Sequence, residues 1–125
     1  MPRVHAMERT IRDDWAFKSA VVEGLVVRLD DDNELAPCAA DSEDAVGYTR
    51  ASTAAGAKCG ILLVNAPGTT MLRTAGSFAK RAEVFQAANG KIDDTGTIRV
   101  GVSLDESTGA DQLVEVLLQH GRISA

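Results

Sequence analysis

The residues in this sequence that could do chemistry are two histidines, two cysteines and two acidic runs. His5 and His120 lie near opposite ends of the chain, and no pattern between them indicates that they meet. Cys38 and Cys59 match no metal-binding spacing and are too few for a disulfide framework, so we expect two reduced thiols. These residue types therefore predict neither a metal site nor a nucleophile paired with a base.

The acidic runs are residues 30–34 (DDDNE) and 41–44 (DSED). The first lacks the alternating ligands, central glycine and distal glutamate of a calcium loop. General acid catalysis needs a carboxyl group in an apolar pocket, whereas both runs have the composition of solvated turns. Ser52-Thr53 and Ser107-Thr108 also lie in turn-like stretches. We therefore expect no enzyme, no catalytic residue, no cofactor and no metal.

The elements that would have to position any site are strands. In residues 98–104 every second side chain is apolar, namely Ile98, Val100, Val102 and Leu104. This period of two predicts a half-buried strand with those four side chains toward the core. Turn-forming residues at 105–111 and a second alternating run, Val114 to Leu118, predict the antiparallel partner strand.

Other stretches predict further strands and little helix. Residues 21–29 read as a strand with a bend at a glycine, and Asn89-Gly90 is a strong hairpin signal. Only residues 76–83 favour a helical turn or two, with Phe78 and Ala82 on the buried edge.

Part of this pattern occurs twice. Val46-Gly47 is echoed 54 residues later by Val100-Gly101, and the apolar run 61–64 is echoed by residues 114–117. We therefore predict two related β units, 21–74 and 80–121. Each alone would have too small a core, so both belong to a single β domain, 21–125. The expected fold is mainly β, a small β-barrel or β-sandwich of the β-tulip or jelly-roll kind, with at most one or two short helices.

Residues 1–20 are expected to form an extended N-terminal arm. Residues 1–12 contain three arginines and one glutamate, a net charge of +2, whereas residues 13–125 contain ten basic and seventeen acidic side chains, net −7. A basic arm on an acidic body predicts a tail that reaches a partner and docks by its aromatic rings. The alternative is a frayed terminus without a role. The candidate contact residues are Arg3, Arg9, Arg12, Trp15 and Phe17.

Composition argues against several classes of partner. The chain has 125 residues and a formal net charge of −5, which makes nucleic acid a poor partner. No apolar run approaches the roughly 20 residues of a membrane span, and residues 1–15 lack the apolar segment of a secretory signal. We therefore expect no membrane partner and synthesis in the cytoplasm. Aromatic residues make up only 4% of the chain, too few to line a convincing small-molecule cavity.

The order of these motifs resembles that of the capsid cement, or head decoration, proteins of tailed bacteriophages. The second unit carries the family's hairpin and its closing strands: Asn89-Gly90-Lys91-Ile92, Val100-Gly101-Val102, Gly109 and Val114-Glu115-Val116-Leu117. The first unit carries the other half of the pattern: Glu23-Gly24-Leu25-Val26-Val27, Leu35-Ala36-Pro37, Val46-Gly47 and Ala55-Gly56. The match covers about residues 20–121. Two features depart from it: Glu83, where the family often has a small residue, and the long arm before Trp15.

The resemblance implies a structural protein on the outer surface of the virion capsid. Such a protein binds the expanded head and clamps neighbouring major capsid protein subunits against internal DNA pressure. The implied partners are the major capsid protein and further copies of this chain, as a homotrimer or alternatively a homodimer. Two other classes stay open: another phage β-module of the tail, baseplate or connector, and a small ligand-binding β-barrel.

Overall fold

The computed structural model describes residues 11–12, 15–42, 44–64 and 68–122. Six strands of this part form the first sheet, in the order β1-β6-β5-β3-β4-β2, and five form the second, in the order β7-β11-β10-β8-β9. The first sheet contains β1 (Ile11–Arg12), β2 (Ala16–Phe17), β3 (Val26–Leu29), β4 (Glu34–Pro37), β5 (Ala45–Thr49) and β6 (Ile61–Leu63). The second contains β7 (Thr69–Arg73), β8 (Glu83–Gln86), β9 (Ile92–Asp93), β10 (Ile98–Ser103) and β11 (Leu113–Arg122). The predicted mainly β fold of the sandwich or barrel kind is confirmed.

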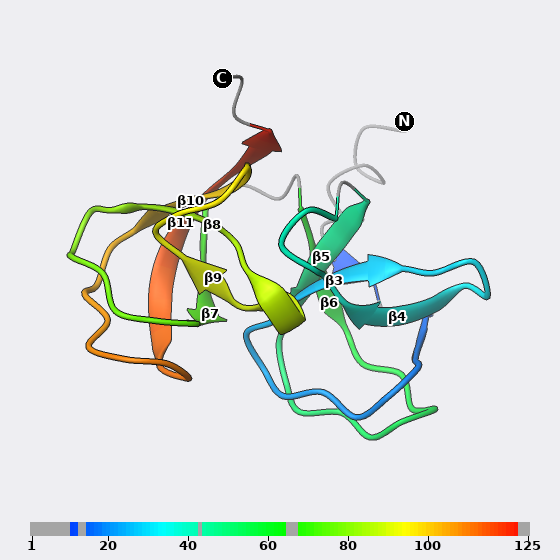
Figure 1. The fold of residues 1–125 in the computed structure, drawn as a ribbon. Coiled ribbons are helices and arrows are strands. Elements are labelled where there is room, and N and C mark those ends of the chain that lie inside the picture. Colours follow the sequence, from blue (N-terminus) through cyan, green and yellow to red (C-terminus); the bar gives the residue numbers. More distant parts are fainter. Residues whose placement is uncertain (1–10, 13–14, 43, 65–67, 123–125) are drawn as a thin grey trace, which may run out of the picture.

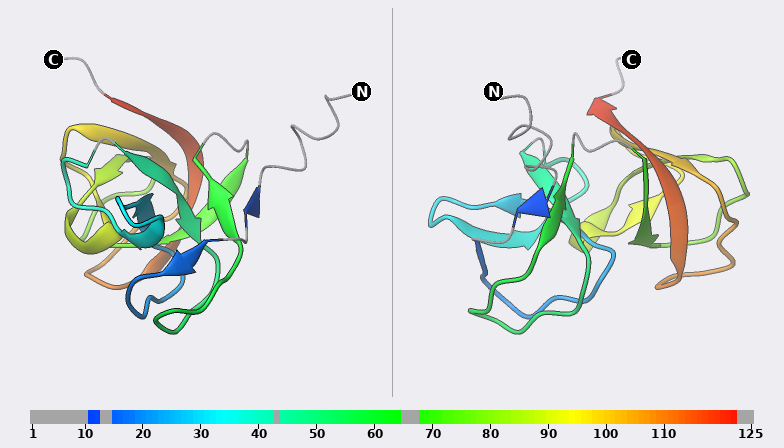
Figure 2. Two further views of the ribbon diagram at one scale, coloured as in Figure 1. Left: turned by 90° about the vertical axis from the view of Figure 1, so that its right-hand side faces the viewer. Right: turned by 180° about the vertical axis from the view of Figure 1, so that it is seen from behind.

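The two sheets lie side by side, with the first on the right of Figure 1 and the second on the left. The same arrangement is seen from behind in Figure 2. A single 3-10 turn, η1 (Ala88–Gly90), connects β8 to β9 and lies between the sheets. Its Gly90 amide donates a hydrogen bond of 2.7 Å to the Cys38 carbonyl, so the second sheet is fastened to the end of β4.

Both sheets use the same strand order. The order β1-β6-β5-β3-β4 in the first corresponds to β7-β11-β10-β8-β9 in the second, and every one of these neighbouring pairs is antiparallel. A parallel contact completes each sheet, from Phe17 to Leu35 in the first and from Thr74 to Ile92 in the second. β7 lies within the first predicted unit but pairs with β11 of the second sheet.

A bulge occurs at the same place in each sheet. Val27 and Arg28 are consecutive, yet their partners on β5 are Gly47 and Ala45, which leaves Val46 as the extra residue. On β10, Val100 is left over in the same way. The glycine after each bulge faces a neighbouring backbone: a Cβ on Gly47 would lie 2.5 Å from the Leu62 carbonyl oxygen. The repeated Val-Gly pair is therefore a bulge followed by a residue that must lack a side chain.

The bulge overturns the predicted inward face of β10. Val102 and Leu104 were expected to point into the core, but both are partly exposed, and Ser103 is fully buried in their place. The extra residue at Val100 shifts the alternation by one position, so later side chains exchange faces. On β11, which has no such shift in this region, the predicted inward residues are buried as expected: Val114, Val116 and Leu118.

Two other local predictions were wrong. Residues 76–83 contain no helix; instead Phe78 pairs with Ser107 through two backbone hydrogen bonds of 2.9 and 3.0 Å. The strand predicted over residues 21–29 begins only at Val26, whereas the bend predicted within it is confirmed at Gly24, whose φ is +83°. The hairpin predicted at Asn89-Gly90 is confirmed as the η1 turn between two antiparallel strands.

Buried side chains of the described residues form two core clusters. One lies inside the first sheet and contains Phe17, Val21, Leu25, Val27, Leu35 and Ile61. The other combines the inner face of the second sheet with the outer face of the first, from which Val26 and Tyr48 contribute fully buried side chains. The second sheet therefore covers the first along the row Val26–Tyr48–Leu62, whose members face one another across β3, β5 and β6.

Candidate interaction surface

The five predicted contact residues do not form one surface in the described part of the chain. Arg3 and Arg9 lie outside the described residues. Arg12 belongs to β1 and pairs with Ile61 at the edge of the first sheet. Trp15 is half-buried against the first core cluster, and Phe17 is 1% exposed within it.

Phe17 is held in the fold from both sides of its backbone. Its amide donates to the Ala57 carbonyl at 3.0 Å, and its carbonyl accepts from the Gly56 amide at 2.8 Å. Its strand, β2, runs parallel to β4. The ring of Phe17 therefore packs inside the chain's own domain, where it cannot also contact a partner.

The most apolar exposed face belongs to the second sheet. Three large hydrophobic side chains are exposed in the described chain, and two of them, Met71 (45%) and Leu117 (37%), lie on this face. Leu117 is opposite Val102 on one side and Thr69 on the other. We define the outer face of the second sheet by seven of the side chains that alternate with its core residues: Thr69, Met71, Glu83, Arg99, Val102, Glu115 and Leu117.

The charged groups on this face are paired with neighbours. The Arg99 guanidinium lies 3.4 Å from the Glu83 carboxylate and donates a 2.6 Å hydrogen bond to the Gln119 side-chain carbonyl. The Thr69 hydroxyl donates to the Glu115 carboxylate at 2.7 Å. The face therefore has an apolar centre and a rim of positively and negatively charged side chains, which is the composition of many protein interfaces.

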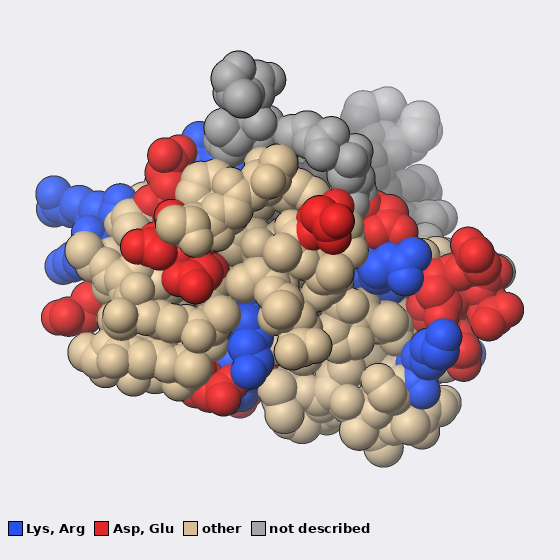
Figure 3. Space-filling view, viewed as in Figure 1, with Lys and Arg blue, Asp and Glu red and all other residues tan. Residues whose placement is uncertain are grey.

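The opposite end of the molecule is acidic. Acidic side chains gather around the β3–β4 turn, at the right of Figure 3. One oxygen of Asp30 accepts the amides of Asp32 and Glu34 at 2.9 and 3.0 Å, and the other lies 3.4 Å from the Lys18 ammonium. The backbone amide of Glu34, more than any other group, lowers the pKa of Asp30. The Asp30 carboxylate therefore holds the turn, as the composition of the run predicted.

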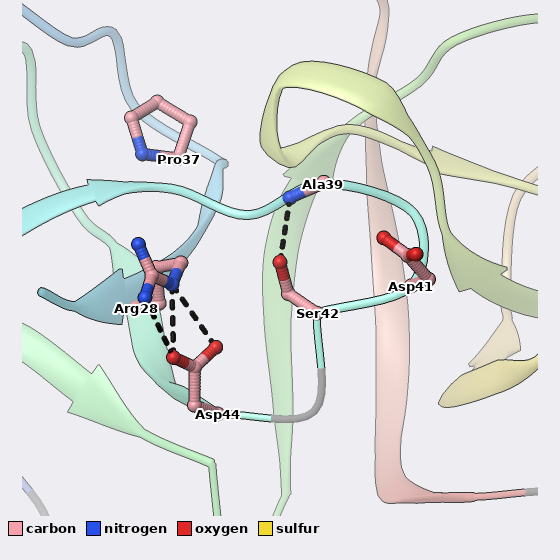
Figure 4. Close-up of a pocket in the computed structure, with 6 residues that line it drawn as sticks. All are labelled: Arg28, Pro37, Ala39, Asp41, Ser42 and Asp44. Carbon is pink, nitrogen blue, oxygen red and sulfur yellow. Dashed lines mark hydrogen bonds and ion pairs between the residues drawn. The ribbon is translucent and has the colours of Figure 1, made fainter.

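A shallow hollow of about 600 Å³ lies at the end of β4 and is shown in Figure 4. Its arginine, Arg28, is bound by both oxygens of Asp44 at 2.9 and 3.1 Å, and this hydrogen bonding lowers the pKa of Asp44. Ser42 accepts the Ala39 amide at 3.0 Å through its hydroxyl. Arg28 and Asp44 bind each other and Ser42 binds the backbone, so the hollow gives no support to a ligand-binding barrel.

Cys38 and Ser107 are buried and belong to the packed fold. Both cysteines are free, Cys38 buried and Cys59 half-buried, and burial raises the pKa of the Cys38 thiol to about 12. The Ser107 hydroxyl donates to the Gly109 carbonyl at 2.7 Å. His5 lies outside the described residues, and His120 is on β11. In the part of the chain that the structure describes, no helix has the length and apolar character to span a membrane.

Comparison with known proteins adds one finding. No family model matches the sequence, and no curated protein matches it. Among solved structures the chain is similar to the N base of the head fiber protein gp8.5 of bacteriophage phi29, with a TM-score of 0.68. The match covers 92% of this chain and 99% of that chain at 13% sequence identity. The chain therefore shares the fold of that base over nearly the whole length of both.

The outer face of the second sheet is the feature that sequence reasoning missed. Met71 and Leu117 are 46 positions apart and meet only through the β7–β11 register. The available signal was on β11, where Leu117 is an apolar residue on the outward side of an alternating strand. The bulge on β10 hid its neighbour Val102, which the alternation placed inside.

Proposed function

We propose that this chain is a structural protein of a tailed-phage virion that binds the outer surface of the expanded head. The observation that carries the proposal is the shared fold with a phage head fiber base over 92% of the chain. The order of sequence motifs, which resembles that of capsid cement proteins, supports the same assignment independently. In this role the protein clamps neighbouring major capsid protein subunits and stabilises the shell against internal DNA pressure.

Physical considerations support a clamp. A pressurised shell fails at the seams between subunits, so a protein that bridges a seam adds contacts that must break together. Because such sites recur over the whole shell, each contact can be modest and the total still large. The net charge of −5 makes decorated heads repel one another and keeps them dispersed.

The basic arm is the proposed contact with the shell or a neighbouring copy. Since Phe17 is buried and β1 begins at Ile11, a truncation that tests the arm must end before Ile11. A chain that lacks residues 1–10 retains every described contact and loses Arg3 and Arg9. We expect it to fold normally and bind shells more weakly; undiminished binding would remove the arm from the account.

The proposed partners are the major capsid protein and further copies of this chain, as a homotrimer or alternatively a homodimer, without nucleic acid, membrane or small-molecule substrate. A second candidate, the base of a head fibre, follows from the same structural similarity. A base would carry a projecting appendage, whereas a cement protein needs none. A tail, baseplate or connector module would share the fold and bind a different partner.

Co-sedimentation with purified shells tests the proposal. Expanded and unexpanded empty shells from the same phage are mixed with increasing amounts of the protein, and the copies bound per capsid subunit are counted. Saturable binding to expanded shells alone is the expected result. Absence of binding to both forms would contradict the proposal and favour a tail or connector module.

A further inference from the structure

On the outer face of the first sheet, one row of side chains is covered by the second sheet. This row, Val26–Tyr48–Leu62, crosses β3, β5 and β6, and Val26 and Tyr48 are 0% exposed. They are buried in a cluster with Leu72, Val84 and Val116 of the second sheet. This outer face is therefore covered by another unit of the same strand order.

The equivalent row of the second sheet has no such cover among the residues that the structure describes. Glu83, Val102 and Leu117 face one another across β8, β10 and β11, as Val26, Tyr48 and Leu62 do across the corresponding strands. The bulges at Val46 and Val100 lie at matching positions, so the equivalence holds residue by residue. Leu117 is 37% exposed, and Met71 on the neighbouring strand is 45% exposed.

We infer that the outer face of the second sheet is the surface through which copies of this chain associate. The corresponding face of the first sheet packs against a unit of the same strand order, so we take a further copy of this chain as the partner. Exposed apolar side chains that lie together on one face of a sheet mark an interaction site. This inference rests on the proposed homo-oligomer and specifies its contact surface.

The distribution of charge favours contact between two copies at this face rather than at the acidic β3–β4 turn. Two molecules of net charge −5 repel, and repulsion is strongest where unpaired carboxylates gather, as around the β3–β4 turn. On the outer face of the second sheet, Glu83 is paired with Arg99, and Glu115 accepts a hydrogen bond from Thr69. The residues that define this face carry two carboxylates and one guanidinium, so two acidic chains oppose less like charge here than at the β3–β4 turn, and burial of Met71 and Leu117 supplies the gain.

The test compares the oligomeric state of three proteins without any shell. Sedimentation velocity over a wide concentration range is recorded for the natural sequence, for the double variant Met71→Lys/Leu117→Lys, and for a control pair, Ala54→Lys/Ala79→Lys. The control adds the same charge at two exposed loop positions. Lysine keeps an apolar stem on the strand, so the variant retains cover for the sheet while placing a charge in the contact.

The natural chain and the control are expected to sediment as a multiple of 13.2 kDa, and the double variant to associate at least about tenfold more weakly. A natural chain that stays monomeric, or a double variant that associates as tightly as the control, would overturn the inference. If the double variant loses its near-ultraviolet circular dichroism, Leu117→Thr gives the same comparison with a residue suited to strands.

Failure of this inference and failure of the proposed function give different results. Association through this face without binding to expanded shells would leave the inference standing and contradict the capsid role. A double variant that associates normally and binds shells stoichiometrically would contradict the inference and leave the capsid role standing.

Discussion

Replacement of Phe17 by alanine tests whether residues 15–17 belong to the domain or to a detachable arm. The Phe17 side chain is 1% exposed and packs in the first core cluster. Truncation of a buried phenylalanine costs about 3–5 kcal/mol, because the transferred apolar surface is lost and the cavity is only partly refilled. Single domains are stable by only about 5–15 kcal/mol, so this one substitution should remove a large fraction of the stability.

The assay is urea and thermal unfolding followed by far-ultraviolet circular dichroism. The Phe17→Ala variant is expected to unfold on the order of 10–20 °C below the natural chain. The matched control is the chain without residues 1–10, whose melting temperature should stay within about 2 °C because the strands begin at Ile11. A Phe17→Ala variant within about 1 kcal/mol of the natural chain would refute the placement of Phe17 in the core.

Four further predictions follow from individual contacts. The buried Tyr48 hydroxyl has no hydrogen-bond partner among the described residues, so Tyr48→Phe should raise the unfolding free energy by about 1 kcal/mol in urea titrations; a loss of that size would reveal a partner. Gly101→Ala should lower the free energy of unfolding by about 1–3 kcal/mol, since the new Cβ meets the Leu117 carbonyl. Gly109→Ala is the control and should be nearly neutral, because the nearest atom to its new Cβ is 3.8 Å away; equal effects of the two substitutions would argue against the bulge. Burial and a pKa raised to about 12 should protect Cys38 from iodoacetamide at pH 8, while half-buried Cys59 reacts; rapid labelling of both in the folded protein would contradict this placement. Arg28 lowers the pKa of Asp44, and Lys91 lowers that of Asp111, so the stability that they contribute is present above the unfolded pKa of about 3.9 and is lost as pH falls below it; in urea titrations Asp44→Asn/Asp111→Asn should lose less stability between pH 7 and pH 3 than the natural chain, and equal losses would contradict these pairs.

The strands of the second sheet could be predicted because their side chains alternate. β11 follows a period of two without interruption from Val114 to Leu118, and all three predicted inward residues are buried. β10 looked equally regular, yet its bulge at Val100 exchanges the faces beyond it. A bulge leaves no gap in an alternating pattern when the extra residue is itself apolar. The only trace in the sequence was the repeated Val-Gly pair.

Tertiary pairing decided the places where local pattern failed. Residues 76–83 have the spacing of a short helix, but Phe78 forms a β-bridge with Ser107 and the chain turns at Lys80-Arg81. The sequence comparison of the two units aligned Ile61 with Val114. In the sheets, Ile61 lies opposite Thr49 and Val116 lies opposite Ser103, so the structural equivalent of Ile61 is Val116. A duplicated origin of the two units stays a prediction, consistent with their common strand order.

The candidate surface could not be predicted from the sequence because it depends on register. Thr69, Val102 and Leu117 form one row only when three strands are aligned, and no local pattern fixes that alignment. The contact residues chosen from composition were the aromatic and basic side chains of the arm. Composition cannot distinguish a ring that docks inside the domain from a ring that docks on a partner.

Electron cryomicroscopy of expanded shells incubated with the protein tests the central claim most directly. The account predicts ordered density on the outer surface that spans the seams between capsid subunits and fits the two-sheet fold. Unexpanded shells in the same experiment should show none. Density confined to the portal or tail, or bare shells at saturating protein, would contradict the assignment to the capsid surface.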